Sequence, residues 1–396
     1  MFQKIKNIYH LLQAISANLW YGFPSRHIKV IGVTGTDGKT TTTHLIYHIL
    51  SSAGKKVSMI STIYGKVGDT EYDTGLHVTT PDPFMVQKMI RDAVLCGDEY
   101  FILETTSHAI DQNRTWGIQY KAAVLTNITH EHLDYHLTIE NYAHTKLSLI
   151  QQAEIGIINI DDSVTRELLS SLSPIKNHRV LSYGLIKKAD YFEDFRAQIH
   201  RLAEFNAYNY LAAYALCIEL GLPREEILPF LKSYKLPLGR IDVVYENKFK
   251  VIVDFAHTPN AVARILETVR KLYVKNDGRI IHVFGSAGLR DVSKRPLMGE
   301  ASGEFADVSI ITEEDYRTED PHVIASEIVT GLSKWRREYE IILDRKEAIY
   351  SALNQAQTDD IVVITGKGHE KSLCRGKKEF PWSDSDCVKA YVSKLS

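Results

Sequence analysis

The sequence predicts an α/β protein with two successive parallel sheets, each covered by helices. Two observations predict this class. From residue 28 onward, short apolar runs rich in Val and Ile alternate with stretches of helical periodicity. The alternation breaks at a stretch with Pro and Gly near residue 238 and then restarts. We therefore divide the chain into an N-terminal helical segment (1–27), a first α/β domain (28–237) and a smaller second one (238–396).

The N-terminal segment has the apolar spacing of an amphipathic helix. Apolar residues recur at every third or fourth position between Phe2 and Leu19, with Lys4 and Lys6 between them. We favour a helix packed against the first domain. The alternative is that residues 1–24 lie weakly on a membrane surface, because apolar and basic side chains together suit a lipid interface.

Five apolar runs in the first domain are too short for helices and therefore predict buried strands. A helical pattern fills residues 39–53, and Gly54 stands where a helix commonly ends. This alternation is typical of a parallel sheet with helices on both faces. The five runs cover residues 27–34, 55–62, 99–106, 121–128 and 154–160.

The second domain repeats the pattern and is predicted to be a smaller, Rossmann-like α/β unit. Predicted helices follow at 259–272, 321–332 and 345–355. The predicted strands cover residues 248–256, 279–287, 307–312, 340–344 and 360–366.

Polar segments follow five of these strands. In an open parallel sheet, ligands gather beyond the C-terminal ends of the strands, so we expect the functional sites there. The five segments are 34–39, 104–108, 126–136, 254–257 and 366–370.

Composition narrows the class of protein. The net charge of −2 gives no reason to expect a nucleic-acid partner, and no apolar run is long enough for a membrane span. The four cysteines form no CxxC pair, which predicts a reducing, cytoplasmic setting without a zinc ribbon. These cysteines are Cys96, Cys217, Cys374 and Cys387.

The first strand runs directly into GTDGKT (35–40), and a predicted helix follows at once. A phosphate loop offers backbone N–H groups and a lysine to phosphate oxygens, and a Ser or Thr hydroxyl to magnesium. The usual first glycine of that motif would fall at Val33, which is one departure from the pattern. The strand–loop–helix frame nevertheless predicts that the first domain is a P-loop ATPase domain. Asp37 adds a carboxylate that Lys39 or magnesium must offset.

The longer pattern GTDGKTTTT resembles the Mur ligases, which are ATP-dependent amide-bond ligases of peptidoglycan precursor synthesis. Further motifs occur in the family's order across residues 28–396, and DFAHTP and GKGHE make the chain most similar to the tripeptide synthetase type. The motifs include TTP (79–81), LETTSHAI (103–110), LTNITHEHLDYH (125–136), FNAYN (205–209), LGRID (238–242), VDFAHTP (253–259), GLRDVSKRPLMG (288–299), ITEEDYRTEDP (311–321) and TGKGHE (365–370).

The resemblance implies a reaction in two steps. ATP gives its γ-phosphate to a carboxylate, and an amine then displaces phosphate from the acyl phosphate to form an amide. Such a transfer needs positioning and charge neutralisation more than covalent help. The implied ATP-binding residues are Gly35, Thr36, Asp37, Gly38, Lys39, Thr40, Thr41, Asn209, Arg240 and Asp254; an N-terminal helix cap is the alternative role for Asp254.

The implied catalytic residues are Lys39, Glu104, His132 and Lys146, and the implied magnesium ligands are Thr40, Glu104, His132 and Lys146. Lys146 would bind the cation after carbamylation by carbon dioxide; without the resemblance, an exposed helix lysine is the simpler interpretation. The run HEHLDYH (130–136) also suggests a two-metal hydrolase. The spacing of Asp134 and His136 disfavours that alternative, which would also leave the phosphate loop unexplained.

The implied substrates are a muramoyl dipeptide and a diamino acid, either meso-diaminopimelate or L-lysine. Arginine suits a carboxylate through its two-pronged geometry, and glutamate suits an ammonium group. The implied dipeptide contacts are Thr79, Thr80, Thr106, Ser107 and Arg114. The implied amino-acid contacts are Arg290, Asp315, Arg317, Gly366 and Glu370. The run Glu314–Arg317 replaces the DNPR that is usual in diaminopimelate enzymes, but it keeps the arginine.

A second departure concerns the start of the chain. About 27 residues precede the first strand, so we expect no N-terminal domain of the kind that holds UDP in this family. Three alternatives stay open: a lipid-linked acceptor, a polyglutamyl-type acceptor, and an ATP-binding scaffold without catalysis. We expect a monomer.

Overall fold

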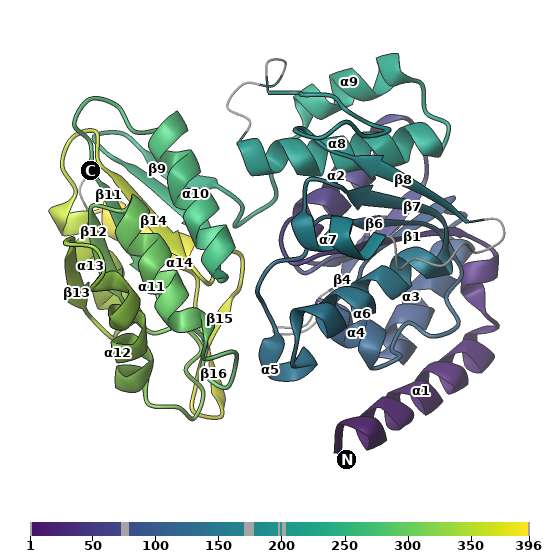
Figure 1. The fold of residues 1–396 in the computed structure, drawn as a ribbon, viewed down its shortest axis with the longest axis horizontal. Coiled ribbons are helices and arrows are strands. Elements are labelled where there is room, and N and C mark those ends of the chain that lie inside the picture. Colours follow the sequence, from purple (N-terminus) through teal and green to yellow (C-terminus); the bar gives the residue numbers. More distant parts are fainter. Residues whose placement is uncertain (1, 73–78, 170–177, 197–198, 200–202, 395–396) are drawn as a thin grey trace. The chain divides into compact units, whose positions relative to one another are not determined.

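The computed structural model describes residues 2–72, 79–169, 178–196, 199 and 203–394. The chain forms two compact units, each a sheet between layers of helices (Figure 1). One unit contains Met1–Thr129 and Thr138–Lys235, and the other contains His130–Leu137 and Leu236–Ser396.

Within its described residues, the first unit contains strands β1 (Lys29–Thr34), β2 (Val57–Ile60), β3 (Gly65–Val67), β4 (Thr70–Tyr72), β5 (Tyr100–Glu104), β6 (Tyr120–Leu125), β7 (Ala153–Asn159) and β8 (Arg179–Tyr183). They form one sheet in the order β4-β3-β2-β5-β1-β6-β7-β8. β1 pairs in parallel with β5 and with β6, where Val33 is opposite Glu104 and Thr34 is opposite Leu125. The C-terminal ends of these three strands therefore meet at one edge.

The helices described in this unit are α1 (Phe2–Tyr21), η1 (Pro24–Arg26, a 3-10 turn), α2 (Lys39–Ser52), α3 (Pro83–Leu95), α4 (Ser107–Asp111), α6 (Ile139–Gln152), α7 (Ser163–Leu168), α8 (Glu204–Glu219) and α9 (Arg224–Ser233). Leu45 of α2 and Leu211 of α8 share a core with Ile31. Ile90 of α3 shares the core of the opposite face with Val30. Successive residues of β1 are thus buried on both faces, as expected for a central parallel strand.

The second unit contains strands β9 (Asp242–Glu246), β10 (Lys250–Asp254), β11 (Ile280–Phe284), β12 (Val308–Ile311), β13 (Glu338–Ile341) and β14 (Ile361–Thr365), and a hairpin of β15 (Ser372–Arg375) and β16 (Lys378–Pro381). The main sheet has the order β13-β12-β11-β14-β10-β9, and only β9 is antiparallel. β10 and β14 are in register at Asp254 and Thr365, so two predicted functional segments start side by side.

The helices of the second unit are α5 (Leu133–His136), α10 (Pro259–Leu272), α11 (Lys294–Phe305), α12 (Pro321–Leu332), α13 (Arg345–Gln355) and α14 (Asp384–Val392). Leu266, Met298 and Ile328 place α10, α11 and α12 against one face of the sheet. Ile349 and Val388 place α13 and α14 against the other face.

The predicted α/β class is confirmed. The helices expected at 259–272, 321–332 and 345–355 have those bounds, and α2 ends at Ser52, one residue before the predicted end. The sequence did not predict the hairpins, nor β8 and β9. β16 is exposed along its whole length, so no apolar run marks it. Among the helices of the described ranges, none is long and apolar enough to cross a membrane.

Candidate functional site

The phosphate loop of the first unit connects the end of β1 to the start of α2 and depends on two glycines. Gly35 has φ 148° and Gly38 has φ 82°, in the region that glycine adopts most easily. A Cβ at Gly35 would lie 1.8 Å from Thr126 Oγ1, and one at Gly38 would lie 2.3 Å from Asn209 Oδ1. Both positions therefore exclude a larger residue by conformation and by space.

Lys39 is the first residue of α2, and its side chain turns back over the loop. Its ammonium group donates to the carbonyl oxygen of Gly35 at 3.1 Å and to that of Thr36 at 2.8 Å. The amine thus lies beside the same backbone whose N–H groups are suited to phosphate.

Asp37 is fixed by the segment that follows β6. Its backbone N–H donates to Asn127 Oδ1 at 2.9 Å, and its carbonyl oxygen accepts from Asn127 Nδ2 at 3.0 Å and from Thr126 Oγ1 at 2.7 Å. The segment after β6 therefore fixes the shape of the loop after β1, and the two polar segments predicted at 34–39 and 126–136 lie in contact.

Thr40 and Glu104 come together at the ends of β1 and β5. The Thr40 hydroxyl donates to Glu104 Oε1 at 2.9 Å, and the Glu104 carboxylate is fully buried. Thr62, which follows β2, also binds this carboxylate: its N–H donates to Oε2 and its hydroxyl to Oε1, both at 2.8 Å. Thr62 was not among the predicted site residues, although its place as the last residue of the strand predicted at 55–62 was a signal.

The pairing of Thr40 with Glu104 fits magnesium. Hydroxyl and carboxylate oxygens are the ligands that this hard cation prefers, and the carboxylate supplies negative charge in a buried place. In the described part of the chain, no cluster of three or more His, Cys, Asp or Glu residues could hold a metal ion.

Lys146 lies on α6 and is 1% exposed. Its ammonium group donates to the Gly35 carbonyl oxygen at 2.6 Å and lies 4.4 Å from the centroid of the Tyr142 ring. The alternative of an exposed helix lysine is therefore wrong. The packing of α6 against the sheet brings this lysine to the phosphate loop, a position that its spacing along the chain does not indicate.

The predicted dipeptide contacts also lie close together in the first unit. The Thr80 hydroxyl donates to the Glu104 carbonyl oxygen at 2.9 Å and accepts from the Thr106 N–H at 3.0 Å. Arg114 donates to the Thr80 carbonyl oxygen at 3.2 Å. Ser107 Oγ is buried and has no hydrogen-bond partner among the described residues. Thr79 joins the group through Thr62, since their hydroxyl oxygens are 3.0 Å apart.

Asn209 lies on α8 of the first unit, where its side chain borders Gly38 and Thr42. Asp254 lies in the second unit, where it accepts from the N–H groups of Ile241 at 2.7 Å and Ala256 at 2.8 Å. Thr258 caps α10 by accepting from the Ala261 N–H at 3.1 Å. The alternative role of Asp254 as that helix cap is therefore wrong.

Arg240 and Arg317 are each held inside the second unit. The Arg240 guanidinium lies 4.7 Å from the centroid of the Phe255 ring. Arg317 has φ 53° and donates to the Gly288 carbonyl oxygen at 2.6 Å. Desolvation lowers the pKa of Arg290, and the nearby Arg317 guanidinium lowers it further. The two positive groups are therefore close enough to interact.

The remaining predicted amino-acid contacts form a buried charge cluster at the end of β14. Lys367 is fully buried and donates to Asp315 at 2.8 Å and to Glu370 at 2.5 Å. Burial alone would lower the pKa of Lys367, but Glu370 and Asp315 outweigh it and raise the pKa. For Glu314 the first cause is burial, which together with Asp315 raises its pKa. A carboxyl oxygen of Glu314 faces Gly366, where a Cβ would lie 2.6 Å away.

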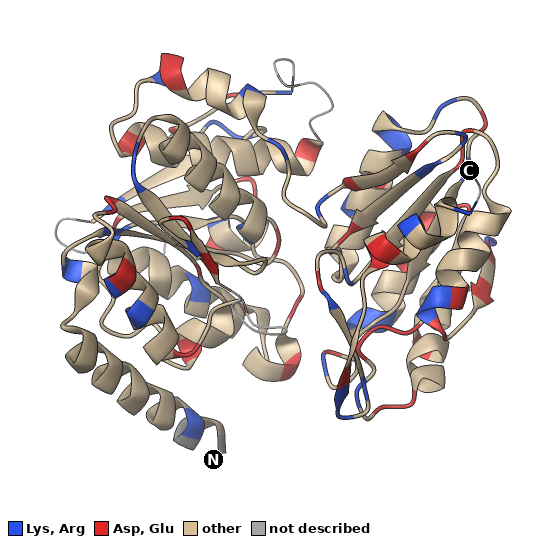
Figure 2. Ribbon diagram, turned by 180° about the vertical axis from the view of Figure 1, so that it is seen from behind, with Lys and Arg blue, Asp and Glu red and all other residues tan. Residues whose placement is uncertain are grey.

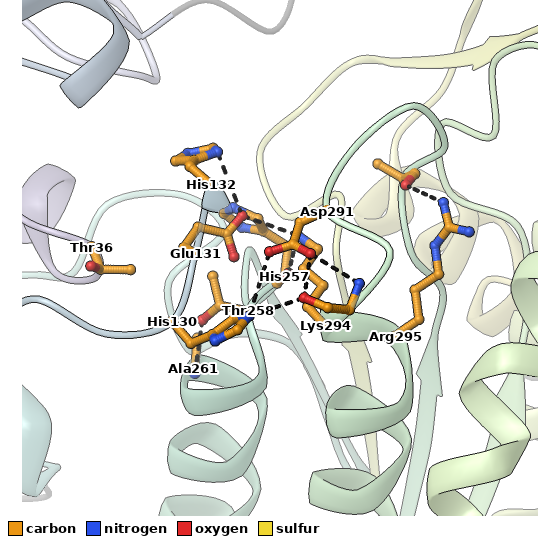
Figure 3. A network of polar contacts seen from close by, with 12 residues as sticks. Thr36, His130, Glu131, His132, His257, Thr258, Ala261, Asp291, Lys294 and Arg295 are labelled. Atoms are coloured by element: carbon orange, nitrogen blue, oxygen red, sulfur yellow. Dashed lines mark hydrogen bonds and ion pairs between the residues drawn. The ribbon is translucent and has the colours of Figure 1, made fainter. Parts of the chain in front are cut away.

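The segment His130–Leu137 belongs to the second unit, and Figure 3 shows its polar contacts. Lys294, at the start of α11, donates to Glu131 Oε1 at 3.2 Å and to the His257 carbonyl oxygen at 2.9 Å. Both side chains of this ion pair are buried. His132 lies directly before α5 and has φ 58°. The predicted metal ligand His132 therefore belongs to the second unit, whereas the predicted ligand Glu104 belongs to the first. The sequence analysis did not single out Lys294 or Glu131.

Two family descriptions match the chain. "Mur ligase middle domain" matches residues 33–217, and "Mur ligase, glutamate ligase domain" matches residues 239–368.

Two similar proteins share the name UDP-N-acetylmuramoyl-L-alanyl-D-glutamate--2,6-diaminopimelate ligase. The protein from Aquifex aeolicus is 38% identical over 393 residues, covering 94% of this chain and 79% of the relative. The protein from Syntrophomonas wolfei is 39% identical over 389 residues, covering 91% of this chain and 77% of the relative.

Two solved structures are also similar to this chain. A ligase of the same name matches with a TM-score of 0.61 and 30% identity, over 93% of this chain and 79% of the other. A bifunctional folylpolyglutamate synthase/dihydrofolate synthase from Yersinia pestis matches with a TM-score of 0.71, over 97% of this chain and 93% of the other. Its identity of 17% shows a common fold alone.

Proposed function

The chain belongs to the Mur ligase family, whose members are ATP-dependent ligases that form an amide bond, and from this premise we propose that it joins a diamino acid to a muramoyl dipeptide. The observation that carries this proposal is the meeting of Thr40, Glu104 and Lys146 around one phosphate loop. A protein that only bound ATP would not need the buried carboxylate and the buried lysine beside it.

The residues of the loop suit the transfer of a phosphoryl group. Backbone N–H groups between Gly35 and Thr40 would hold the phosphates, and Lys39 would neutralise charge on the oxygens that move. Thr40 and Glu104 would hold magnesium, which neutralises further charge on the phosphates when bound. His132, the remaining ligand implied by the resemblance, stays a prediction.

We propose that Lys146 is carbamylated in the active enzyme. A buried ammonium group is costly, and a carbamate would exchange it for an anion that can bind a cation. Lys39 donates to the same carbonyl oxygen of Gly35 as Lys146 does. The Lys39 ammonium group therefore lies close enough to form an ion pair with a carbamate on Lys146.

The diamino acid is proposed to be meso-diaminopimelate. Arg290 and Arg317 supply positive charge for a carboxylate, and Glu370 supplies negative charge for an ammonium group. The two relatives described above carry the name of diaminopimelate ligases. L-Lysine is the second candidate, because Glu314, Asp315 and Tyr316 replace three residues of the usual loop.

A phosphate-release assay tests the proposal. UDP-muramoyl dipeptide or a lipid-linked muramoyl dipeptide is combined with ATP, magnesium and either meso-diaminopimelate, L-lysine or L-glutamate. We expect phosphate release with the dipeptide and meso-diaminopimelate. Release with L-lysine alone would reassign the amino acid, and release only with a lipid-linked dipeptide would reassign the acceptor. Tight ATP binding without release in any combination would favour a scaffold.

We also propose that α1 associates weakly with an anionic membrane surface. Ile8, Leu12 and Leu19 lie within about 40° of one another around the helix and are 58%, 59% and 67% exposed. Ala14 and Ala17 of the same helix are buried, so one face is packed while this apolar face is open. No Asp or Glu precedes Asp37, and Figure 2 shows α1 without acidic residues. An apolar face with basic residues complements anionic lipid.

Flotation with phosphatidylglycerol vesicles tests this association. We expect the parent protein to float and Leu12→Lys to remain in the soluble fraction, while Leu297→Lys on the exposed part of α11 floats like the parent. Equal flotation of the Leu12 variant, or equal binding to phosphatidylcholine vesicles, contradicts the proposal. The cytoplasmic location and the monomeric state stay predictions.

A further inference from the structure

We propose that Thr62 is a positioning residue that sets the Glu104 carboxylate for magnesium and links it to the dipeptide-binding residue Thr79. This inference deepens the proposed function and depends on it. The sequence patterns did not single out Thr62, and its position follows from the end of β2 beside β5 in the sheet.

Thr62 holds both oxygens of the carboxylate. Its N–H donates to Glu104 Oε2 and its hydroxyl to Oε1, both at 2.8 Å. Two donors from one residue fix the plane of a carboxylate as well as its place. Oε1 also accepts from Thr40 at 2.9 Å, so the two hydroxyls meet at the oxygen nearest the phosphate loop.

This arrangement prepares a site for a cation. Glu104 is fully buried, and without donors its charge would be costly to keep there. Thr40 and Glu104 would hold magnesium, and the Thr40 hydroxyl would then give up its hydrogen bond to Oε1. The Thr62 contacts can stay unchanged, so Thr62 would fix the carboxylate in both states.

The same hydroxyl also contacts Thr79, one of the residues predicted to bind the muramoyl dipeptide. The Thr62 hydroxyl has one proton and lies within donating distance of both Glu104 Oε1, at 2.8 Å, and Thr79 Oγ1, at 3.0 Å. When that proton is on the carboxylate, the Thr62 oxygen can accept from the Thr79 hydroxyl across the same 3.0 Å contact. A dipeptide that binds Thr79 therefore acts on a group hydrogen-bonded to the metal-binding carboxylate. Loss of the Thr62 hydroxyl would weaken cation binding and would separate it from Thr79.

The test measures Mn²⁺ binding by electron paramagnetic resonance, with the full chain and a non-hydrolysable ATP analogue. Removal of a hydrogen bond to a buried charge is expected to raise the Mn²⁺ dissociation constant of Thr62→Val about tenfold. Thr62→Ser keeps the hydroxyl and is expected to bind like the parent. Thr330→Val removes an exposed threonine hydroxyl on α12 of the second unit and serves as the matched control.

A second comparison tests the link to Thr79. Thr79→Val is expected to weaken Mn²⁺ binding in the parent background and to have no further effect in the Thr62→Val background. Unchanged Mn²⁺ affinity in Thr62→Val, with thermal unfolding like the parent, overturns the positioning role. Additive effects of the two substitutions overturn the link alone. If the parent with nucleotide binds no Mn²⁺, the proposed function itself fails, and this inference fails with it.

Discussion

Lys146 donates to the carbonyl oxygen of Gly35 at 2.6 Å, across 111 positions of the sequence. Lys39 donates to the same oxygen at 3.1 Å. Two ammonium groups thus share one backbone acceptor inside the first unit, and one of them is almost fully buried. Conversion of Lys146 into a carbamate would replace a pair of like charges by a pair of opposite charges.

We therefore predict that Lys146 takes up carbon dioxide. After incubation with ¹³C-labelled bicarbonate, the parent protein is expected to give a carbamate signal by NMR that Lys146→Ala lacks. Ligase activity of Lys146→Ala is expected to fall by at least about a hundredfold, because the variant loses a charged group at the phosphate loop. Lys271→Ala, on the exposed side of α10, is the control and should keep both signal and activity. An equal signal in Lys146→Ala and the parent would refute the modification.

Gly38→Ala is predicted to weaken ATP binding strongly, because φ of 82° strains any side chain and the new methyl group would meet Asn209 Oδ1 at 2.3 Å, so the loop or the Asn209 side chain would have to move. Gly54→Ala is the matched control, since Gly54 has a similar φ of 75° but no atom within 4 Å of its Cβ position. The control is expected to lose about 1–2 kcal/mol of stability from the left-handed backbone alone and to bind ATP normally. Isothermal titration with ATP and denaturant unfolding separate the two effects. Normal ATP affinity in Gly38→Ala would contradict the loop geometry.

The sequence predicted the centre of each sheet better than its edges. β1, β5 and β6 are buried at nearly every position, so largely apolar runs mark them. The edge strand β13 and the hairpin strand β16 are exposed throughout; the strand predicted at 340–344 overlaps β13 only at its last two residues, and no apolar run marks β16. An apolar run in the sequence indicates that a strand is buried. An exposed strand lacks such a run, because it forms mainly through its pairing with the adjacent strand.

The same limit applies to the candidate site. The meeting of Thr40 with Glu104 could be expected, because both follow adjacent parallel strands. The burial of Lys146 could not, since it depends on how α6 packs. The ion pair of Lys294 with Glu131 joins residues 163 positions apart, and no local pattern encodes such a pair.

His282 is predicted to make the stability of the second unit depend on pH. Burial, with a smaller effect of Arg345, lowers the pKa of His282 to about 3. The imidazole is held neutral between Ser302 at 2.8 Å and Thr365 at 2.9 Å. An unfolded chain binds a proton here below pH 6.5, whereas the folded chain does so only near pH 3. The free energy of unfolding therefore has the full contribution of neutral His282 above pH 6.5. This contribution falls by about 1.4 kcal/mol per pH unit as the pH drops from 6.5 towards 3.

Denaturant unfolding between pH 7.5 and pH 4.5 checks this dependence. His282→Gln is expected to be less stable than the parent at pH 7.5, with a difference that shrinks at lower pH. His322→Asn replaces an exposed histidine on α12 and should keep the pH slope of the parent. A constant difference between His282→Gln and the parent at all pH values would show that His282 does not carry the slope.

Arg345→Met is predicted to destabilise the second unit by about 3–5 kcal/mol, because it leaves the Asp384 carboxylate buried without its cation. The two side chains are fully buried and joined by two hydrogen bonds, at 2.8 and 2.7 Å. Arg345 also donates to the Thr365 carbonyl oxygen at 2.8 Å, next to Gly366 of the predicted amino-acid site. We therefore expect diamino-acid affinity to fall as well. Lys334→Ala breaks the exposed pair with Glu300 and should cost less than about 1 kcal/mol. Equal losses in the two variants would mean that burial adds nothing to this ion pair.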